Sequence, residues 1–411
     1  MIQKIKGTMD ILPDETPLFR YIEGIMREEA EKYGYGEIRT PTFEFTELFV
    51  RGVGDTTDIV QKEMYTFSDD DKQISLRPEG TAGVARAIIE NGKCSDTMPL
   101  KYYYIISCFR HEKPQAGRSR EFFQFGTEMF GSNSPAADAT AIALAASVIR
   151  RLGLKGVKLH INSIGCKACR PAYREALTEH FKKNEERLCD NCKSRLVKNP
   201  LRLLDCKNPD CKEIAAPAPK TIEYLCPECE EKFNMLKASL DAMNIDYVVD
   251  SSIVRGLDYY TGAVFEFIAE GIGAQSTVCG GGRYDGLVSS LGGPELSGIG
   301  FGMGITRLIL AMREQGLDNI PVTHPRLYIA ALGARATVKA LEITERLRRE
   351  GTVAECDIVG RSLKAQMKYA NKIGAEYTLI IGDSEIDAGE AQLRNMADGT
   401  QSTVKLDSFT F

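Results

Sequence analysis

The feature that most constrains the fold is residues 102–130, where two apolar runs flank a short connection. The first run, at 102–106, reads YYYII and is rich in the β-branched and aromatic residues that favour strands. A turn-forming Pro-Gln-Ala-Gly follows at 114–117. The second run extends over 122–130. We therefore predict an antiparallel hairpin at this point in the chain.

Polar side chains are distributed unevenly over this hairpin. Its loop carries Arg110, Arg118 and Arg120. The second run carries Gln124 and Glu128, which are four residues apart and share one face of a regular strand. Such a site suits a ligand with an anionic end and a positively charged or donor-rich end. The alternative for this segment alone is a solvated hairpin with ordinary surface charge.

Length and composition limit the class of protein. A chain of 411 residues should hold two or three domains around a sizeable core. No apolar run approaches the roughly 18 residues of a membrane span, and the first residues lack the apolar core of a signal peptide. We expect a cytoplasmic protein with no membrane partner. The net charge of −5 argues only weakly against nucleic-acid binding, because a local basic face is enough.

Three strings near residue 280 combine glycines with polar side chains. VRGLDYYTG, at 254–262, sets an arginine and two tyrosines between glycines, and a purely structural role for it is hard to sustain. CGGGRYDG follows at 279–286, where backbone can approach a ligand closely. LSGIGFGMGITRLIL, at 296–310, predicts a glycine-rich strand that runs into a helix. Neither a dinucleotide fingerprint nor a phosphate-loop string occurs, so a nucleotide here would need arginines on an antiparallel sheet.

Residues 165–246 contain eight of the twelve cysteines, and three of their four pairs have C-x-x-C spacing. Eight thiolates could fill two zinc sites with four cysteines each. The alternatives are reduced structural cysteines or redox-active pairs. The sequence does not tell which cysteines would share a metal. The candidate ligands are Cys166, Cys169, Cys189, Cys192, Cys206, Cys211, Cys226 and Cys229.

The C-terminal part follows a linker at 315–325. Apolar strands then alternate with helical patterns over 327–381, which predicts a small α/β domain with parallel strands. The helix predicted at 362–373 has a basic first turn that could touch RNA phosphates or simply be solvated.

Several of these motifs resemble those of one enzyme family. Arg110-X-Glu112 in a hairpin loop resembles the second signature motif of class II aminoacyl-tRNA synthetases, and 109–128 as a whole closely resembles the form found in histidyl-tRNA synthetases. The RPEGT string at 77–81 and the two strings at 254–262 and 279–286 are similar to motifs of the same family. Residues 296–310 resemble the third class II motif, except that Thr306 stands where the class usually has an acidic residue.

This resemblance spans the whole chain and implies an architecture. It implies an α+β class II catalytic domain, an antiparallel sheet flanked by helices, in two parts at 1–164 and 247–318. A mainly helical, cysteine-rich domain would be inserted at 165–246, and a C-terminal α/β anticodon-binding domain would occupy 325–411. The extended segment around Pro41 resembles the first class II motif, which implies a homodimer.

The implied activity is that of a histidine–tRNA ligase. It would activate L-histidine with ATP and Mg²⁺ to histidyl-adenylate and transfer the histidyl group to the 3′ end of tRNA(His). The resemblance assigns catalysis to Arg110, Arg255 and Arg307. It assigns ATP binding to Arg110, Glu112, Arg118 and Arg307. It assigns histidine binding to Glu79, Gly80, Thr81, Gln124, Glu128, Arg255, Tyr259 and Tyr260.

Individual roles follow from the same resemblance. Glu128 and Tyr260 would bind the imidazole, and Tyr259 would line its pocket. Glu79, Thr81 and Gln124 would hold the α-amino group. Arg255 would stand opposite Arg110 and supply the charge that other class II enzymes take from an additional magnesium. From the residues alone, Glu79 could instead merely cap the helix that follows it.

The main alternative is a non-catalytic relative, the regulatory subunit of ATP phosphoribosyltransferase in histidine biosynthesis. Such proteins share the catalytic fold, typically lack the C-terminal domain and lose the ATP-binding arginines. Here Arg110, Arg255 and Arg307 are present and the C-terminal pattern is complete. A cysteine-rich redox or zinc-dependent protein is a third hypothesis.

Overall fold

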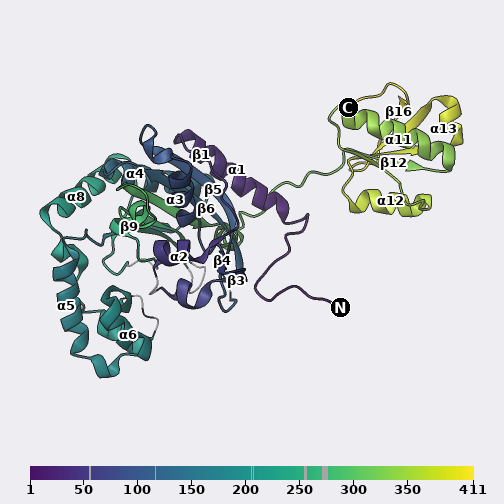
Figure 1. Ribbon diagram of the computed structural model, residues 1–411. Coiled ribbons are helices and arrows are strands. Elements are labelled where there is room, and N and C mark those ends of the chain that lie inside the picture. Colours follow the sequence, from purple (N-terminus) through teal and green to yellow (C-terminus); the bar gives the residue numbers. More distant parts are fainter. Residues whose placement is uncertain (55–56, 116, 205, 207, 254–256, 271–275) are drawn as a thin grey trace. The chain divides into compact units, whose positions relative to one another are not determined.

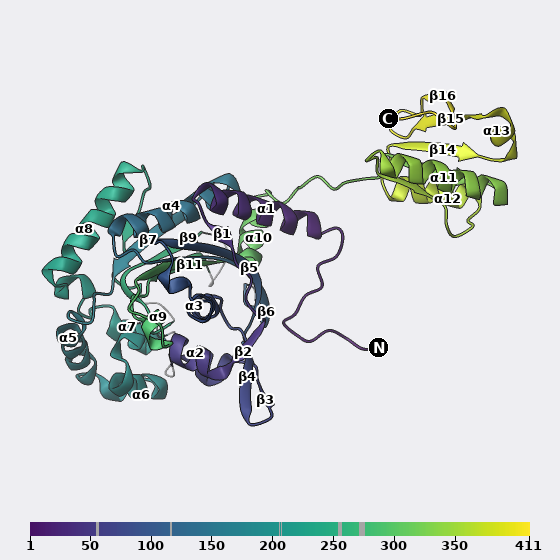
Figure 2. The same cartoon turned by 45° about the horizontal axis from the view of Figure 1, so that its top comes forward.

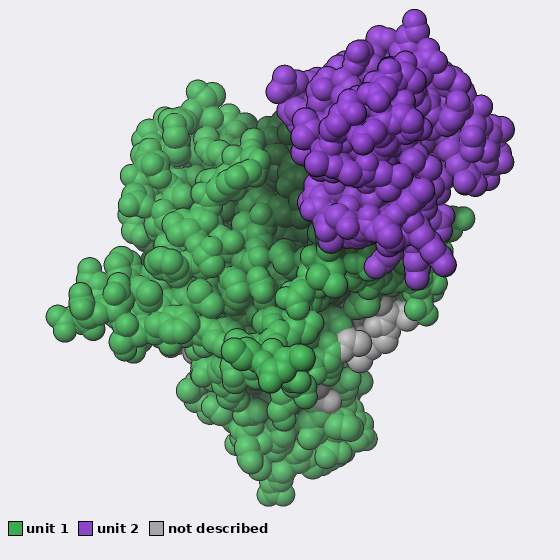
Figure 3. Space-filling view, turned by 90° about the vertical axis from the view of Figure 1, so that its right-hand side faces the viewer, with its two compact units in different colours: residues 1–320 green, residues 321–411 purple. Residues whose placement is uncertain are grey.

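A computed structural model of the chain describes residues 1–411 except 55–56, 116, 205, 207, 254–256 and 271–275. The chain divides into two compact units, residues 1–320 and 321–411, which are coloured separately in Figure 3. Among the described helices, none has both the length and the apolar character needed to cross a membrane.

Unit 1 is built on an eight-stranded sheet with the order β1-β5-β6-β11-β10-β9-β7-β8. All neighbours from β5 to β7 pair antiparallel, and only the edge strands β1 and β8 pair parallel. The predicted hairpin is formed by β5 and β6, and both strands exceed the predicted runs. The strands are β1 Gly36–Glu37, β5 Leu100–Phe109, β6 Glu121–Phe130, β7 Val157–Ser163, β8 Val248–Val249, β9 Thr261–Ala269, β10 Thr277–Arg283 and β11 Gly298–Gly304.

Helices cover both faces of this sheet (Figure 2). Phe265 packs with α1, α4, α8 and α10, whereas its neighbour Val264 packs with α3 and α9. Because successive strand residues point to opposite faces, the two clusters lie on the two sides of the sheet. The antiparallel sheet flanked by helices is therefore as predicted. The helices are α1 Thr16–Lys32, α3 Thr81–Glu90, α4 Pro135–Arg151, α8 Pro227–Ala242, α9 Leu287–Ser290 and α10 Ile305–Glu314.

A second, three-stranded sheet stands beside the large one, with the order β2-β4-β3. It contains the predicted strand pair near residues 66 and 75 and leaves the rings of Phe43, Phe45 and Phe67 about half exposed. Its elements and the short turns nearby are β2 Phe43–Phe45, α2 Thr46–Val53, η1 Ile59–Glu63, β3 Thr66–Asp69, β4 Lys72–Leu76 and η2 Lys93–Ser95.

The cysteine-rich segment between β7 and β8 is helical in its described residues (Figure 1). It has a small core of its own that includes Tyr173, Phe181 and Leu196. The last helix, α8, packs instead against α4 and joins the main core through Leu236 and Leu240. The limits predicted for the inserted domain stay a prediction. The remaining elements of the segment are α5 Arg170–Lys182, η3 Glu185–Arg187, α6 Asp190–Lys198, η4 Pro200–Leu203, α7 Pro209–Ala215 and η5 Thr221–Tyr224.

Unit 2 is an α/β unit with a five-stranded sheet in the order β13-β12-β14-β15-β16. Strands β13, β12 and β14 are parallel, as predicted, whereas β15 and β16 form an antiparallel hairpin that the sequence pattern did not reveal. The elements are β12 Leu327–Ala331, α11 Ala334–Arg349, β13 Ala354–Cys356, α12 Leu363–Lys372, β14 Tyr377–Ile381, α13 Asp383–Ala388, β15 Glu390–Asn395 and β16 Gln401–Lys405.

Candidate active site

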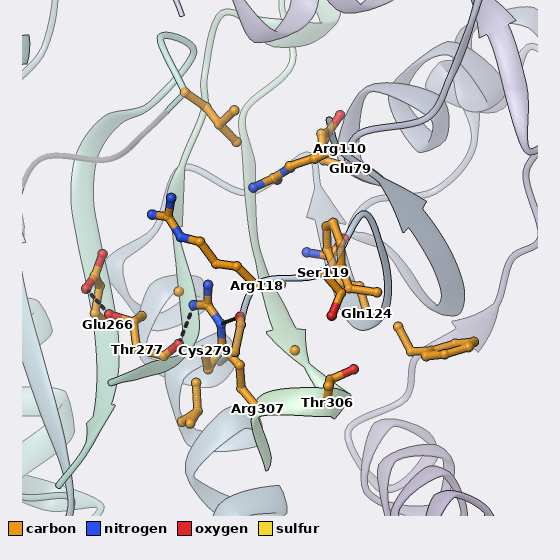
Figure 4. A pocket seen from close by; sticks show the side chains of 18 of the residues that line it. Glu79, Arg110, Arg118, Ser119, Gln124, Glu266, Thr277, Cys279, Thr306 and Arg307 are labelled. Carbon is orange, nitrogen blue, oxygen red and sulfur yellow. Dashed lines mark hydrogen bonds between the residues drawn. The ribbon is translucent and has the colours of Figure 1, made fainter. Parts of the chain in front are cut away.

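A cavity of about 340 Å³ lies in unit 1. Its lining comes from the loop before α3, the hairpin loop, β6, the segment before β9, β10, β11 and the start of α10 (Figure 4). These segments are distant in sequence, and the sheet order brings them together because β6, β11, β10 and β9 are consecutive neighbours. The cavity therefore combines the hairpin with the glycine-rich strings predicted to approach a ligand.

One group of lining residues is acidic or carries amide and hydroxyl groups. Glu79, Thr81 and Gln124 all line the cavity. The carboxylate of Glu79 accepts hydrogen bonds from the backbone N–H groups of Thr81, at 2.7 Å, and Ala82, at 2.8 Å. Burial raises the pKa of Glu79, and these N–H groups offset part of that effect. Glu79 thus caps α3, as the structural alternative proposed, and also faces the cavity.

Glu128 is fully buried and is not part of the cavity lining. Its carboxyl oxygens accept hydrogen bonds from the hydroxyls of Thr81, at 2.7 Å, Tyr104, at 3.0 Å, and Tyr284. Burial raises its pKa to about 8, although the hydroxyls of Tyr284 and Thr81 favour the ionised form. Through Thr81, Glu128 is linked directly to the cavity wall.

Two glycines of β11 make room for the polar side chains of β6. A Cβ atom at Gly300 would overlap the carboxylate of Glu128, and one at Gly302 would overlap the amide nitrogen of Gln124. Residues two apart on a strand share a face. Gln124 and Glu128 therefore point to the same side of the sheet, as predicted, and the glycines of the 296–310 string leave space for both.

Three arginines reach the cavity from different segments, Arg110 and Arg118 from the hairpin loop and Arg307 from α10 (Figure 4). Burial lowers the pKa of Arg307, and the guanidinium groups of Arg110 and Arg118 lower it further. Like charges that crowd together in this way repel one another. An anionic ligand between them would relieve that repulsion.

Backbone carbonyls hold two of these arginines, Arg110 and Arg307, in place. Arg110 donates from Nε to the carbonyl of Pro78 at 3.0 Å, and its guanidinium lies 5.1 Å from the ring centre of Phe122. Arg307 donates to the carbonyls of Gly117, at 3.1 Å, and Thr277, at 2.7 Å.

The side chain of Glu112 also lines the cavity, and one of its oxygens lies 3.2 Å from a guanidinium nitrogen of Arg118. The Thr306 hydroxyl lines it as well and has no hydrogen-bond partner among the described residues. All three ATP-site candidates from the hairpin loop, Arg110, Glu112 and Arg118, therefore line the cavity. Thr306 adds a polar atom to which the sequence assigned no role.

The other predicted residues have three different placements. Tyr259 and Tyr260 line the cavity, with their ring centres 4.7 Å apart. Gly80 does not line it; this residue is the N-cap of α3, and a Cβ atom there would overlap the ring of Tyr104. Arg255 lies outside the described residues.

Sequence reasoning missed the hydroxyls of Tyr104 and Tyr284, which bind Glu128 from β5 and from the turn after β10. Tyr284 belongs to the CGGGRYDG string, and this motif was the sequence signal that could have identified it. The arginine of that string, Arg283, is buried away from the cavity and forms a 2.6 Å ion pair with Asp138 of α4.

None of the eight candidate metal-binding cysteines lines the cavity. They gather within the inserted segment as two groups of four.

Comparison with known proteins gives a consistent result. Residues 7–308 match the family model for histidyl-tRNA synthetase, and residues 326–410 match that for an anticodon binding domain. The histidine–tRNA ligase of Desulforamulus reducens is 50% identical over 403 residues, which cover 98% of this chain and 96% of that protein.

Solved structures agree. The crystal structure of the apo S. aureus histidyl-tRNA synthetase has a TM-score of 0.83 and 38% identity, and the match covers 99% of this chain and 98% of that one. An ATP phosphoribosyltransferase regulatory subunit/histidyl-tRNA synthetase from Bacillus halodurans, at 24% identity and a TM-score of 0.63 over 93% of this chain and 98% of that one, shares the fold. The chain, with its class II catalytic sheet and its anticodon-binding unit, belongs to the histidyl-tRNA synthetase family.

Proposed function

We propose that this chain is a histidine–tRNA ligase that forms histidyl-adenylate from L-histidine and ATP and transfers the histidyl group to the 3′ end of tRNA(His). One observation carries the proposal. A single cavity combines the Glu79, Thr81 and Gln124 group with the guanidiniums of Arg110 and Arg307. The first group suits the ammonium of an amino acid, and the arginines suit a triphosphate.

The first step needs no general base, because the histidine carboxylate is already a nucleophile. It attacks the α-phosphorus of ATP, a P–O bond forms, and the bond to the pyrophosphate leaving group breaks. Catalysis then depends on in-line positioning and on neutralising phosphate charge. We assign Arg110 to the α-phosphate and the attacking carboxylate, and Arg307 to the adenine and the γ-phosphate. We assign Arg118 to ATP and Glu112 to the adenine.

The cofactor chemistry follows from that step. ATP would enter as its magnesium complex, since Mg²⁺ binds phosphate oxygens readily. We propose that Arg255 supplies positive charge opposite Arg110, an assignment that rests on the family resemblance alone. In the second step the adenylate acylates the terminal ribose of tRNA(His) and AMP leaves.

Recognition of histidine needs partners for both imidazole nitrogens. Glu128 lies behind the cavity wall, where three described hydroxyls donate to its carboxyl oxygens, and one of the donors, Thr81, lines the cavity. On the family resemblance we propose that Glu128 serves one imidazole nitrogen and Tyr260 the other, with Tyr259 beside them. A different side chain would leave these buried groups unpaired, which is a strong basis for selectivity.

Each of the two units offers a surface for a macromolecular partner. We propose that unit 2 contacts the anticodon part of tRNA(His), supported by its match to an anticodon binding domain. We also propose a homodimer, supported by the exposed rings of Phe43, Phe45 and Phe67 on the small sheet, an apolar surface that a second copy could cover. We propose that the protein works in the cytoplasm, where its proposed substrates are used.

Charging of tRNA tests the proposal. Purified protein should attach histidine to a tRNA(His) transcript in the presence of ATP and Mg²⁺, and should attach none to a transcript for another amino acid. A regulatory subunit of ATP phosphoribosyltransferase would bind its partner enzyme and charge no tRNA. Failure to charge tRNA(His), from folded protein, would favour that alternative.

A further inference from the structure

The two cysteine groups in the inserted segment form a pattern that the catalytic reaction does not explain. Within each group, the four sulfur atoms all lie within 4.8 Å of one another. The first group is Cys166, Cys169, Cys226 and Cys229, and the second is Cys189, Cys192, Cys206 and Cys211. The grouping is nested: the outermost pairs of the segment join each other, and the two inner pairs join each other.

The sulfur–sulfur distances fit one cation per group. Cys166 Sγ lies 3.6 Å from Cys169 Sγ and 3.9 Å from Cys226 Sγ, and Cys189 Sγ lies 3.8 Å from Cys206 Sγ. Four sulfurs at about 2.3 Å from a central zinc ion are separated by about 3.8 Å along the edges of the tetrahedron. Disulfide sulfurs, by contrast, are about 2.05 Å apart. The geometry is therefore that of a tetrahedral sulfur site.

Backbone N–H groups point at several of these sulfurs. Ala168 donates to Cys166 Sγ at 3.3 Å, and Cys226 donates to Cys169 Sγ at 3.1 Å. In the second group, the N–H of Cys189 donates to Cys211 Sγ at 3.4 Å. Hydrogen bonds of this kind stabilise the thiolate charge that metal ligands carry and orient the ligand. Such hydrogen bonds to the ligand atoms are typical of protein metal sites.

The inserted segment has only a small core of its own, and three cysteines of the second group, Cys192, Cys206 and Cys211, belong to it. Its helices α6 and α7 have nine and seven residues. A core this small rarely stabilises a fold by itself, and metal ions commonly supply the missing free energy. Without a metal ion, four buried or half-buried thiols in each group would stabilise the segment less than larger apolar side chains would.

The segment contacts the loop that carries the two pocket tyrosines. The guanidinium of Arg170, the residue directly after Cys169, donates to the backbone carbonyl of Tyr260. From the second group's side, Asn199 donates to Asp258 Oδ1 at 3.1 Å and Arg202 donates to the same oxygen at 3.2 Å. Asn199 and Arg202 follow α6, whose first turn contains Cys192. Each cysteine group thus lies next to a contact on the 258–260 loop.

We propose that each cysteine group binds one Zn²⁺ ion and that the two sites hold the helices that position Asp258 and Tyr260 beside the histidine pocket. The sites are structural, because four cysteines leave no open position for a substrate. The positioning part rests on the proposed function, whereas the metal part does not.

Metal content tests the first part without any assay of activity. Full-length protein, purified from zinc-supplemented culture, should contain two zinc ions per chain by mass spectrometry of the elements. X-ray absorption at the zinc edge should show four sulfur neighbours at about 2.3 Å. Protein without zinc, with iron in its place, or with nitrogen or oxygen neighbours would overturn the proposal.

Paired substitutions test the nested grouping. Cys166→Ser with Cys229→Ser should remove one zinc ion, whereas Cys166→Ser with Cys189→Ser should remove both. A grouping by neighbours in sequence predicts the opposite result for each pair and would overturn ours. Cys94→Ser with Cys356→Ser, outside both groups, should keep two ions. Should the serine variants fail to fold, the absorption measurement on unaltered protein still decides the coordination.

Kinetics test the positioning part. Arg202→Met should keep two zinc ions and raise the KM for histidine about tenfold, with the KM for ATP changed less than twofold. Arg202→Lys should recover part of the loss. Arg187→Met, which breaks an exposed ion pair with Glu213 in the same segment, should change neither KM. An unchanged histidine KM in Arg202→Met would overturn the positioning role. If the unaltered protein formed no adenylate, the proposed function would fail while the zinc result stood.

Discussion

The carboxyl group of Glu128 shows how single residues connect the pocket to the sheet beneath it. It is buried, with hydroxyls from Thr81, Tyr104 and Tyr284 on its oxygens. Motif resemblance was enough to predict Glu79, Thr81, Gln124 and the two tyrosines that line the cavity. It could not reveal the tyrosines that bind Glu128, because their reach depends on strand register and on small residues opposite them. Tyr284, for example, packs where a Cβ atom at Gly298 would stand.

The raised pKa of Glu128 makes stability depend on pH in a defined direction. Its pKa in the folded protein is about 8, above the ordinary value of about 4.3. Between these values the folded state keeps a proton that the unfolded state has released. Stability from this group is therefore complete below about pH 4 and is lost as pH rises towards 8.

Glu128→Gln should remove that component. In urea unfolding measured from about pH 5 to about pH 8, the free energy of unfolding should fall less steeply in the variant than in the unaltered protein. Other groups with raised pKa values, such as Asp138, are common to both proteins and cancel in the comparison. Equal slopes would contradict the assignment.

Gly302→Ala should weaken histidine binding. The new methyl group would displace the amide of Gln124, which we assign to the α-amino group, and loss of one such hydrogen bond costs about 1–3 kcal/mol. We expect the KM for histidine to rise about tenfold or more. Gly286→Ala is the matched control, since a Cβ atom there meets nothing within 4 Å. A histidine KM unchanged in Gly302→Ala would exclude this role for Gln124.

At the scale of elements, apolar runs predicted the strands that are largely buried. The hairpin of β5 and β6 and the parallel strands of unit 2 are confirmed. The β15–β16 hairpin escaped prediction because its strands are mostly exposed and contain few apolar residues, Ala391, Leu393 and Val404. The nested grouping of the cysteines depends on how the helices of the inserted segment pack together, and the spacing of cysteines in the sequence does not reveal that packing.

The ion pair between Arg283 and Asp138 joins the end of β10 to the first turns of α4. Both side chains are nearly fully buried. Arg283→Met should leave Asp138 buried without its partner and lower the free energy of unfolding by about 3–5 kcal/mol. Chemical unfolding measures this, and adding Asp138→Leu should recover part of the loss. A decrease below about 1 kcal/mol would show that the pair does not hold these elements together.

At the scale of the whole molecule, two units with separate cores divide the proposed work. The cavity lies entirely in unit 1, and the anticodon-binding match lies entirely in unit 2. Resemblance predicted an anticodon-binding part after the catalytic part, as the two family models match, whereas the predicted domain limits stay a prediction. It did not predict that α8, at the end of the cysteine-rich segment, would pack with the catalytic core.

A shortened chain that ends at Ile320 should keep the formation of histidyl-adenylate and lose most of the charging of tRNA(His). Because unit 1 contains the whole described cavity, histidine-dependent exchange of pyrophosphate into ATP should stay within about tenfold of the full chain. Charging of tRNA(His) should fall by more than about tenfold, because contacts worth at least 1.4 kcal/mol are lost. Equal charging by the shortened chain would show that unit 2 adds nothing to tRNA binding.

The most direct test of the central claim is exchange of labelled pyrophosphate into ATP, measured with each amino acid in turn for the unaltered protein and for Arg255→Ala. We predict exchange with L-histidine alone, and its loss in the variant. Exchange with no amino acid, from folded protein with magnesium present, would contradict the account and favour a regulatory subunit. Full exchange in Arg255→Ala would contradict the charge we assign opposite Arg110.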